Sequence, residues 1–436
     1  MISDHADPLA KVGSKESGGQ NVYVMNVAAL LARNGHKVDV YTRWDARSKQ
    51  EEVQVRPGFR VIRVAAGPRG YMPRDSFLHI TDDFARRIQE RVQREGLRYD
   101  VIFTNYWFSG VIGLQLAKLY DLPLTHVYHS IGQTKFETLQ KVHPEEVDQA
   151  LFAVRAQWEK RIAEQAASII ATSPVEQGDV IRLFGVPKKK VVCIPVGVDA
   201  QLFKPRSQRW CRQKLKLGTA GQLVLYVGRL EWRKGVATLI RAMHLPQLAN
   251  TELYVVGGGN TKATKTLDAG ERARLQAIVK ELRLTKRVHF LGGKPQHQLA
   301  LYYGAADVCA VPSYYEPFGI VPIEAMSCGT PVVASATGGM RFTVRPGRTG
   351  QLAMPNNTAE LAAKLALTLT KGKAAYAAAA RAHVLQNFSW PKIARAISDH
   401  LQTLHSAAHA GVGAASLAAT KQQAADIARR MATDIV

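Results

Sequence analysis

The feature that most constrains the fold is an alternation of short β-branched runs with longer amphipathic segments. Runs rich in Val and Ile recur through the first half of the chain, and apolar residues at helical spacing lie between them, as in residues 21–34. Such alternation predicts an α/β fold, in which a parallel sheet carries helices on both faces. The strands expected in this half are residues 38–42, 61–64, 101–104, 124–128, 169–172 and 191–195.

The pattern then restarts after a stretch with Gly and Pro between Val196 and Pro205. The strands expected beyond it are residues 223–228, 253–257, 288–291, 308–311 and 331–334. Two α/β units of similar size predict two Rossmann-like domains with a cleft between them, and ligands of such sheets bind at the carboxyl ends of the strands. The predicted parts are an N-terminal domain (1–198), a C-terminal domain (199–387), a helix (388–405) and an Ala-rich tail (406–436).

The net charge of the chain limits the classes of partner that we expect it to bind. Its 436 residues include 58 Lys and Arg against 35 Asp and Glu, a formal charge of +23. This excess favours an anionic ligand, an anionic membrane surface or nucleic acid, unless the charge is spread over solvated helix faces. No basic segment interleaved with aromatic residues accompanies it, so nucleic acid is not expected as a partner. Peripheral contact with an anionic membrane stays an open alternative.

Cysteine usage and the start of the chain bear on location. Cys193, Cys211, Cys309 and Cys328 form no C-x-x-C pair, so neither a zinc ribbon nor a redox motif is predicted. Residues 1–5 lack the basic and apolar regions of a secretory signal. We therefore expect a cytoplasmic location, with peripheral association at the inner face of the membrane as the variant. Only three residues precede the first glycine loop, so the first strand is expected to be short or truncated.

The first motif is a glycine loop within residues 11–24 that leads into a helix. The absence of a side chain at Gly18 and Gly19 lets backbone N–H groups approach an anion closely, and a helix N-terminus adds positive potential. The spacing is neither G-x-G-x-x-G nor that of a P-loop, so a nicotinamide cofactor is not indicated. Taken alone, the motif is equally consistent with a plain loop.

The second motif spans residues 227–235 and follows a predicted strand. Arg229 and Lys234 lie five residues apart across a turn, so both side chains can converge on one group. A diphosphate suits this pair, because Arg binds it bidentately and Lys binds it as a point charge. The alternative is a solvated basic turn.

The third motif, residues 313–333, is the most specific. Seven residues separate Glu316 from Glu324, and Pro317 and Gly329 bracket a predicted helix. Glu316 is expected in the loop before this helix and Glu324 inside it. The N–H groups at the helix start would face an anion, and they belong to Phe318, Gly319 and Ile320.

Together these motifs resemble the retaining glycosyltransferases of family 4, which have the GT-B fold. The resemblance covers residues 1–405, and the nearest subgroup holds the inositol-phosphate N-acetylglucosaminyltransferases and the sucrose-phosphate synthases. Residues 2–9, 105–110 and 129–130 carry this finer similarity. The chain departs from the subgroup at Asn105, where a His is usual, and residues 133–135 match only in part.

The resemblance implies an activity as well as a fold. It implies two domains that face each other across a cleft, with the helix 388–405 crossing back to the first domain. It also implies transfer of a sugar from a nucleotide-diphosphate sugar to a hydroxyl, with retention of the anomeric configuration. The donor is expected to be UDP-linked. No Asp-x-Asp occurs, so the metal-diphosphate site of the other glycosyltransferase fold has no ligands here. No metal or cofactor is expected besides the nucleotide-sugar co-substrate. The alternative is a non-catalytic nucleotide-sugar-binding relative.

The resemblance also implies roles for particular residues. The implied catalytic residues are His129, Glu316, Arg229 and Lys234. The implied donor-binding residues are Gly18, Gly19, Arg229, Lys234, Lys294, Glu316, Phe318, Gly319, Ile320 and Glu324. The implied acceptor-binding residues, for a small phosphorylated polyol or sugar or a lipid-linked glycan, are Asn21, Arg74, Tyr106, Ser130 and Arg161.

Some of these residues have a structural alternative. His129 could be a hydrogen-bonded core histidine, Lys294 a surface lysine, and Arg161 the partner in a salt bridge on a helix surface. Strand alternation points His126 to the face opposite His129, and Trp390 is expected to serve packing rather than chemistry.

Overall fold

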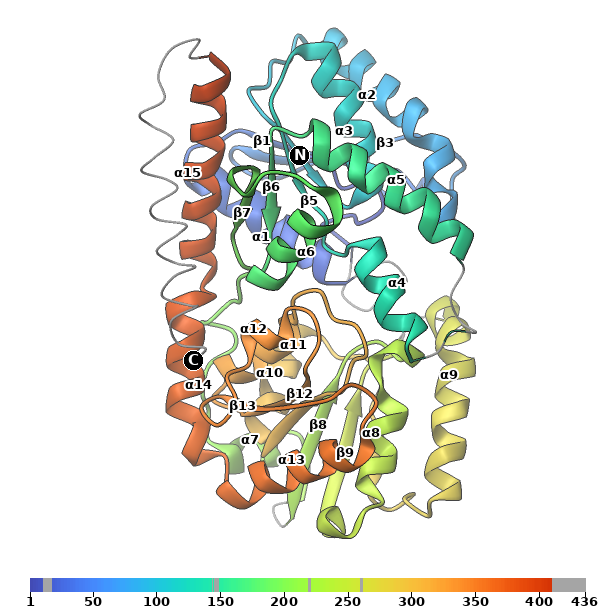
Figure 1. Cartoon of the computed structure of the whole chain (residues 1–436), viewed down its shortest axis with the longest axis vertical. Coiled ribbons are helices and arrows are strands. Elements are labelled where there is room, and N and C mark those ends of the chain that lie inside the picture. The colour runs from blue at the N-terminus through green and yellow to red at the C-terminus, as the bar shows by residue number, and fades with distance from the viewer. Residues whose placement is uncertain (11–17, 143, 145–148, 219–220, 259–261, 410–436) are drawn as a thin grey trace.

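The computed structural model describes residues 1–10, 18–142, 144, 149–218, 221–258 and 262–409. It consists of two α/β units, one above the other in Figure 1, with a long C-terminal helix running along one side of both. Among the described residues, none of the helices combines the length and apolar character that a membrane crossing requires. The predicted tail lies outside the described residues from 410 onward, as do residues 11–17 of the glycine loop.

The first unit is built on a sheet in two parts, with strand orders β2-β3-β1 and β4-β5-β6-β7. Ile2 joins the parts, because it bridges in parallel to Tyr41 of β1 and to Thr104 of β4. One residue therefore holds the position where a first strand was expected. The bounds are β1 Val38–Arg43, β2 Glu52–Arg56, β3 Phe59–Val64, β4 Ile102–Asn105, β5 Leu124–Val127, β6 Ser168–Ala171 and β7 Val191–Cys193.

The second unit holds a six-stranded sheet, ordered β10-β9-β8-β11-β12-β13, in which every pair is parallel. The strand order reverses between β8 and β11, and in open α/β sheets the crevice at such a point is where ligands bind. The second and third motifs follow these two strands. The bounds are β8 Gln222–Val227, β9 Thr251–Val256, β10 Val288–Phe290, β11 Val308–Val311, β12 Val332–Ser335 and β13 Gly350–Ala353.

Helices cover both faces of each sheet, and local signals set their ends. Before α6, for example, Ser173 accepts a hydrogen bond from the Glu176 N–H, and Pro174 occupies the first turn. The first unit contains α1 Gly19–Arg33, η1 Arg74–Ile80, α2 Thr81–Glu95, α3 Trp107–Tyr120, α4 Gly132–Gln140, α5 Gln149–Gln165, α6 Pro174–Phe184 and η3 Lys188–Lys190. The second contains α7 Gln208–Lys214, η4 Trp232–Lys234, α8 Val236–Met243, η5 Pro246–Leu248, α9 Lys262–Glu281, α10 Gln296–Ala305, α11 Ile320–Ser327, α12 Met340–Thr343, α13 Thr358–Lys371 and α14 Ala374–Asn387.

The last helix, α15 (Trp390–His409), returns to the first unit as predicted (Figure 1). Trp390 is 4% exposed, and its ring lies 6.1 Å from that of Tyr23 in α1. A Cβ on Gly197 would come within 2.5 Å of the Trp390 ring, so only glycine fits beneath the indole. Farther along, His400 lies 2.7 Å from the Ser168 hydroxyl in β6. Trp390 thus fastens the crossing by packing.

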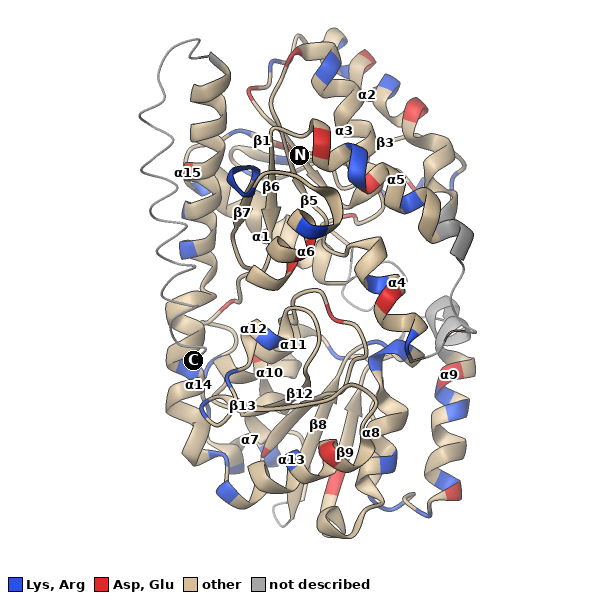
Figure 2. Cartoon of the chain, viewed as in Figure 1, with Lys and Arg blue, Asp and Glu red and all other residues tan. Residues whose placement is uncertain are grey.

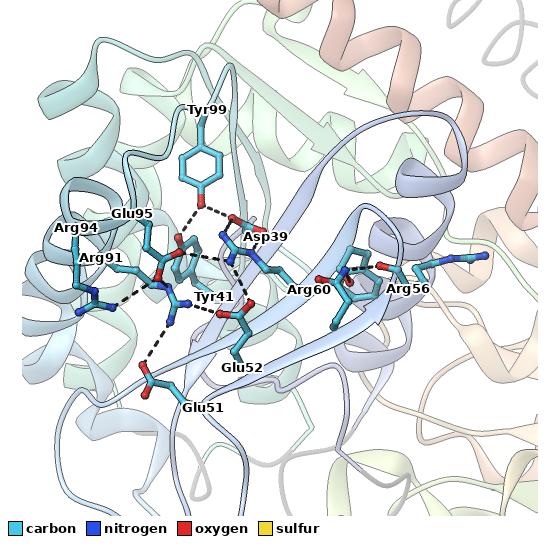
Figure 3. A network of polar contacts seen from close by, with 12 residues as sticks. Asp39, Tyr41, Glu51, Glu52, Arg56, Arg60, Arg91, Arg94, Glu95 and Tyr99 are labelled. Atoms are coloured by element: carbon cyan, nitrogen blue, oxygen red, sulfur yellow. Dashed lines mark hydrogen bonds and ion pairs between the residues drawn. The ribbon is translucent and has the colours of Figure 1, made fainter.

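A network of paired charges covers the outer strands of the first unit (Figure 3). Arg60 of β3 pairs bidentately with Asp39 of β1, with N–O distances of 2.7 and 2.9 Å, and reaches Glu52 of β2 at 3.1 Å. Arg91 of α2 also pairs with Glu52. The Tyr99 hydroxyl donates to Asp39, and the Asp39 carbonyl accepts from the terminal amine of Met1. The network ties the edge strand to the rest of the sheet.

Candidate active site

A cleft of about 800 Å³ separates the two units and is lined by both. The sequence-predicted residues on its first wall are Gly18, Gly19, Asn21, Tyr106, His129 and Ser130. Those on its second wall are Arg229, Lys234, Lys294, Glu316, Phe318, Gly319, Ile320 and Glu324. The fold therefore brings into one space residues more than 300 positions apart in the chain. It does so because both sheets direct the carboxyl ends of their strands toward this cleft.

Two predicted acceptor residues are not among the cleft lining. Arg74 begins η1, and its side chain lies outside the described residues. Arg161 of α5 is exposed, with its guanidinium 5.2 Å from the centre of the Trp158 ring. The cation that α5 brings to the cleft is Arg155. Six residues turn a side chain by about 240° around a helix, so the two arginines face different ways.

Arg155 is buried and held from several sides. Its Nε lies 2.7 Å from Glu159, its Nη1 donates to the Tyr106 hydroxyl at 3.1 Å, and its Nη2 donates to the Ser130 carbonyl. Glu159 also accepts from the Gly132 N–H at 2.8 Å. Burial raises the pKa of Glu159, whereas the charge of Arg155 opposes that shift. These contacts hold the guanidinium in one geometry at the first wall of the cleft.

His5 is a second lining residue that the sequence prediction left out. Its Nδ1 lies 3.3 Å from one carboxylate oxygen of Asp4, and the other oxygen of Asp4 accepts a hydrogen bond from the Ser109 hydroxyl at 2.5 Å. Because a carboxylate only accepts, Nδ1 donates the proton in this contact. The ring meets Tyr106 edge-on at 4.9 Å. The Asp4-His5 pair within residues 2–9 was the signal that could have found it.

His129 follows β5 and adopts a left-handed backbone, with φ +56°. Its Nε2 lies 3.0 Å from Oδ1 of Asn105, whose own Nδ2 donates to the Ile2 carbonyl. The residue that departs from the subgroup pattern is thus the partner that orients this ring. Burial, together with the nearby His5, lowers the pKa of His129 to about 3, so the imidazole is neutral. A strained, half-buried and neutral histidine at a cleft is typical of a functional position.

His126 is buried three residues earlier, and its Nδ1 lies 2.8 Å from the Thr104 hydroxyl. It is absent from the cleft lining, as strand alternation predicts.

The second wall carries three cations close to two carboxylates. Lys234 Nζ lies 2.5 Å from Glu316, and Glu231 pairs with both Arg229 at 2.5 Å and Arg233 at 2.7 Å. Burial alone would raise the pKa of Glu316, but the charge of Lys234 and then of the two arginines holds it below its ordinary value. Glu316 is therefore ionised, and this wall keeps an excess positive charge.

Helix α11 begins between these groups, with Gly319 at φ +94° as its N-cap. The first N–H groups of a helix lack intrahelical acceptors, so they form a site for an anion. The preceding loop is anchored by Gly339, whose N–H donates to the Glu316 carbonyl at 3.1 Å. Across the cleft, a Cβ on Gly19 would come within 2.9 Å of Ile320 Cδ1. The glycine loop and the start of α11 therefore face each other closely.

Glu324 lies in the second turn of α11 and is 7% exposed. It accepts a hydrogen bond from the Tyr303 hydroxyl of α10 at 2.8 Å. Burial raises its pKa to about 7, even though the hydrogen bond from Tyr303 opposes that shift. Burial thus raises the pKa of Glu324, whereas the neighbouring cations lower that of Glu316, although the two residues share one motif.

Comparisons with known proteins bear on both halves. Residues 208–383 match the family described as glycosyl transferases group 1, and residues 17–202 match glycosyltransferase family 4. The chain is 34% identical over 423 residues to a D-inositol 3-phosphate glycosyltransferase of Corynebacterium jeikeium (strain K411), covering 94% of this chain and 98% of the relative.

Two solved structures extend the comparison. Sucrose-phosphate synthase from Thermosynechococcus elongatus is 38% identical, with a TM-score of 0.84 over 93% of this chain and 98% of that one. Anabaena HepE in complex with UDP is 25% identical, with a TM-score of 0.69 over 90% of this chain and 98% of that one.

Proposed function

This chain belongs to the group 1, family 4 glycosyltransferases and has the GT-B fold, and from that premise we propose that it transfers a hexosyl group from a UDP-sugar to a hydroxyl of a phosphorylated polyol or sugar. The transfer retains the anomeric configuration and needs no metal ion. The observation that carries the proposal is a cleft with a cationic group on each wall, Lys234 on one and Arg155 on the other.

The second wall suits a nucleotide diphosphate. Arg229, Lys234 and the start of α11 offer charge and N–H donors to the two phosphates, which is electrostatic stabilisation of a leaving group in a preformed site. In this proposal Glu324 accepts hydrogen bonds from the ribose hydroxyls. Lys294, after β10, adds a cation near the base. The complex of HepE with UDP supports UDP as the nucleotide.

The first wall suits a phosphorylated acceptor. Arg155 can bind a phosphate bidentately, and Tyr106 and Ser130, with which it shares hydrogen bonds, add hydroxyls. The names of the corynebacterial relative and of the cyanobacterial structure both contain a phosphorylated polyol or sugar. His5 and Asn21 lie on the same wall and can take acceptor hydroxyls.

The proposed chemistry uses no protein nucleophile. A diphosphate oxygen leaves the anomeric carbon and takes the proton of the acceptor hydroxyl, which bonds to the same face of the sugar. Lys234 and Arg229 stabilise the charge that develops on the departing oxygen. His129 is neutral and donates its Nε2–H to Asn105, so its Nδ1 can accept a hydrogen bond from a sugar hydroxyl without adding charge. Closure of the two walls excludes water from the reacting bond.

The test is a panel of UDP-, GDP- and ADP-sugars, each assayed for binding and turnover with and without EDTA. We expect saturable, EDTA-resistant use of one UDP-sugar and transfer to a phosphorylated polyol or hexose. NMR of the product then gives its anomeric configuration. Donor binding with no turnover on any acceptor would support the non-catalytic relative. Failure to bind every donor by a protein with a cooperative melting transition would overturn the proposal.

A further inference from the structure

The side chain of Tyr315 crosses the cleft. Tyr315 lies in the loop between β11 and α11 and is 4% exposed. Its hydroxyl lies 3.3 Å from Ser130 Oγ and donates to the Ile131 carbonyl at 3.4 Å. A phenol has one proton to donate, so the Ser130 hydroxyl donates to the phenol oxygen. A residue of the second unit is thus hydrogen-bonded to the loop that follows β5 in the first unit.

Both ends of this connection are adjacent to residues of the cleft. On one side, Ser130 is next to His129, and its carbonyl accepts from Arg155. On the other side, Tyr315 is next to Glu316, which pairs with Lys234 at 2.5 Å. The contacts therefore run without interruption from the cation of the first wall to that of the second.

The connection has a small apolar base. Leu139 of α4 packs with Tyr314 and Tyr315, and Trp232 and Val142 pack against this cluster. Removing only the Tyr315 hydroxyl leaves the ring and this packing in place, so the polar part of the connection can be tested alone.

We propose that Tyr315 is a positioning residue that fastens the His129 loop to the Glu316 loop, so that the reacting groups of both walls are assembled together and the donor is protected from water. This inference rests on the proposed function, because it concerns the same cleft. Closure that completes a site and excludes water is a general route to selectivity for the acceptor hydroxyl over water.

The experiment compares Tyr315→Phe with Tyr314→Phe. Tyr314 is adjacent, but its hydroxyl lies 2.8 Å from Thr238 of α8 within the second unit. For Tyr315→Phe we expect the kcat of transfer to fall by about fivefold to tenfold, the effect of losing one or two neutral hydrogen bonds. The share of donor lost to water should rise, while the Kd for UDP stays within about twofold, because the donor contacts remain. Equal kinetics of the two variants would overturn the inference.

A double-mutant cycle with Ser130→Ala approaches the same contact from the other unit. The cycle is measured as donor hydrolysis in the absence of acceptor, because Ser130 is also a proposed acceptor ligand. We expect the double variant to hydrolyse the donor no faster than the faster single variant, because both substitutions remove one interaction. Additive increases would assign the two hydroxyls to separate roles and overturn the inference. The cycle also serves if melting shows that Tyr315→Phe is poorly folded, since Ser130→Ala alone should then raise the hydrolysed share.

Failure of the proposed function can be distinguished from failure of the inference about Tyr315. If the wild-type protein engages no nucleotide sugar, the proposed function fails, and Tyr315 is judged by small-angle scattering of the unliganded proteins. A larger radius of gyration for Tyr315→Phe than for Tyr314→Phe supports the connection between the walls. Equal radii overturn it.

Discussion

The two halves of the molecule handle charge differently. Residues 1–198 carry 27 Lys and Arg with 22 Asp and Glu, whereas residues 199–436 carry 31 with only 13. In the first half, acidic and basic side chains are interspersed and many pair in the network on the outer strands (Figures 2 and 3). The second half keeps a surplus of positive charge, which draws a polyanion toward it over longer distances than direct contact.

The same contrast appears inside the cleft. Arg155 on the first wall is matched one to one by the buried Glu159, at 2.7 Å. On the second wall, three cations share Glu231 and Glu316. In the proposed function, the first wall supplies a fixed recognition group, whereas the second supplies the excess charge that a departing diphosphate needs.

The largest effect on catalysis is expected when positive charge is removed from the second wall. Lys234→Ala should lower kcat by about 10³-fold, the cost of losing a preorganised electrostatic stabiliser, while the protein still melts cooperatively. Steady-state kinetics with the donor found in the panel measures the loss. Arg241→Ala, on the exposed face of α8 outside the cleft, is the matched control and should keep wild-type turnover. A loss of less than tenfold for Lys234→Ala would contradict the assigned role.

On the first wall, the corresponding change acts on stability as well as on recognition. Arg155→Met leaves the carboxylate of Glu159 buried without its cation, so the free energy of unfolding should fall by about 3 kcal/mol. Urea denaturation measures this change. Adding Glu159→Gln should restore most of the lost stability, but it should not restore the KM for the acceptor. Arg161→Met on the exposed face of the same helix should change stability by less than about 0.5 kcal/mol.

The raised pKa of Glu324 predicts that the stability of the folded protein depends on pH. Its pKa is raised by burial to about 7 in the folded protein, so the folded state binds its proton more tightly than the unfolded state does. The stabilisation is fully present below the unfolded pKa of about 4.3 and is lost as pH rises through 7. Wild type should therefore lose about 3 kcal/mol relative to Glu324→Gln between pH 4.5 and 8. Glu176, whose pKa burial also raises to about 7, contributes equally to both proteins. A pH-independent difference would argue against the raised pKa.

The smallest effect is expected in the network on the outer strands. Glu52 is 37% exposed at its side chain and pairs with Arg60 and Arg91. Glu52→Gln should change the free energy of unfolding by less than about 0.5 kcal/mol, because exposed pairs are screened by solvent. Chemical denaturation at low and high salt measures it. A loss above about 1 kcal/mol would show that the pairs act as a cooperative unit rather than as separate surface contacts.

Much of the fold was predictable because its signals are local. The eleven expected strands all appear, with ends shifted by at most two residues, and α15 crosses back as expected. The strands β2 and β13 were missed. β2 is half exposed at the sheet edge, so its sequence lacks the apolar run that marks a buried strand. β7 ends at Cys193 rather than at residue 195, because Pro195 has no N–H to donate to a sheet.

The residues of the cleft also divide into those that local sequence motifs predicted and those that they missed. Motifs that combine glycine, charge and a helix start are legible in sequence, so the Arg229, Lys234 and Glu316 group was found. Arg155 was not, because choosing between it and Arg161 requires the rotation of α5 against the sheet. His5 was not named either, because its role depends on Asp4 and Ser109, which are brought together only by folding.

The sequence by itself determined the two α/β units, the glycine loops and the paired glutamates, because spacing and residue type are properties of a short segment. Only the tertiary structure decided which arginine enters the cleft, that His129 is neutral, and that the pKa of Glu316 is lowered whereas that of Glu324 is raised. These outcomes depend on burial and on neighbours up to hundreds of residues away. The hydroxyl of Tyr315 illustrates this, because its partners Ser130 and Ile131 belong to the other half of the chain.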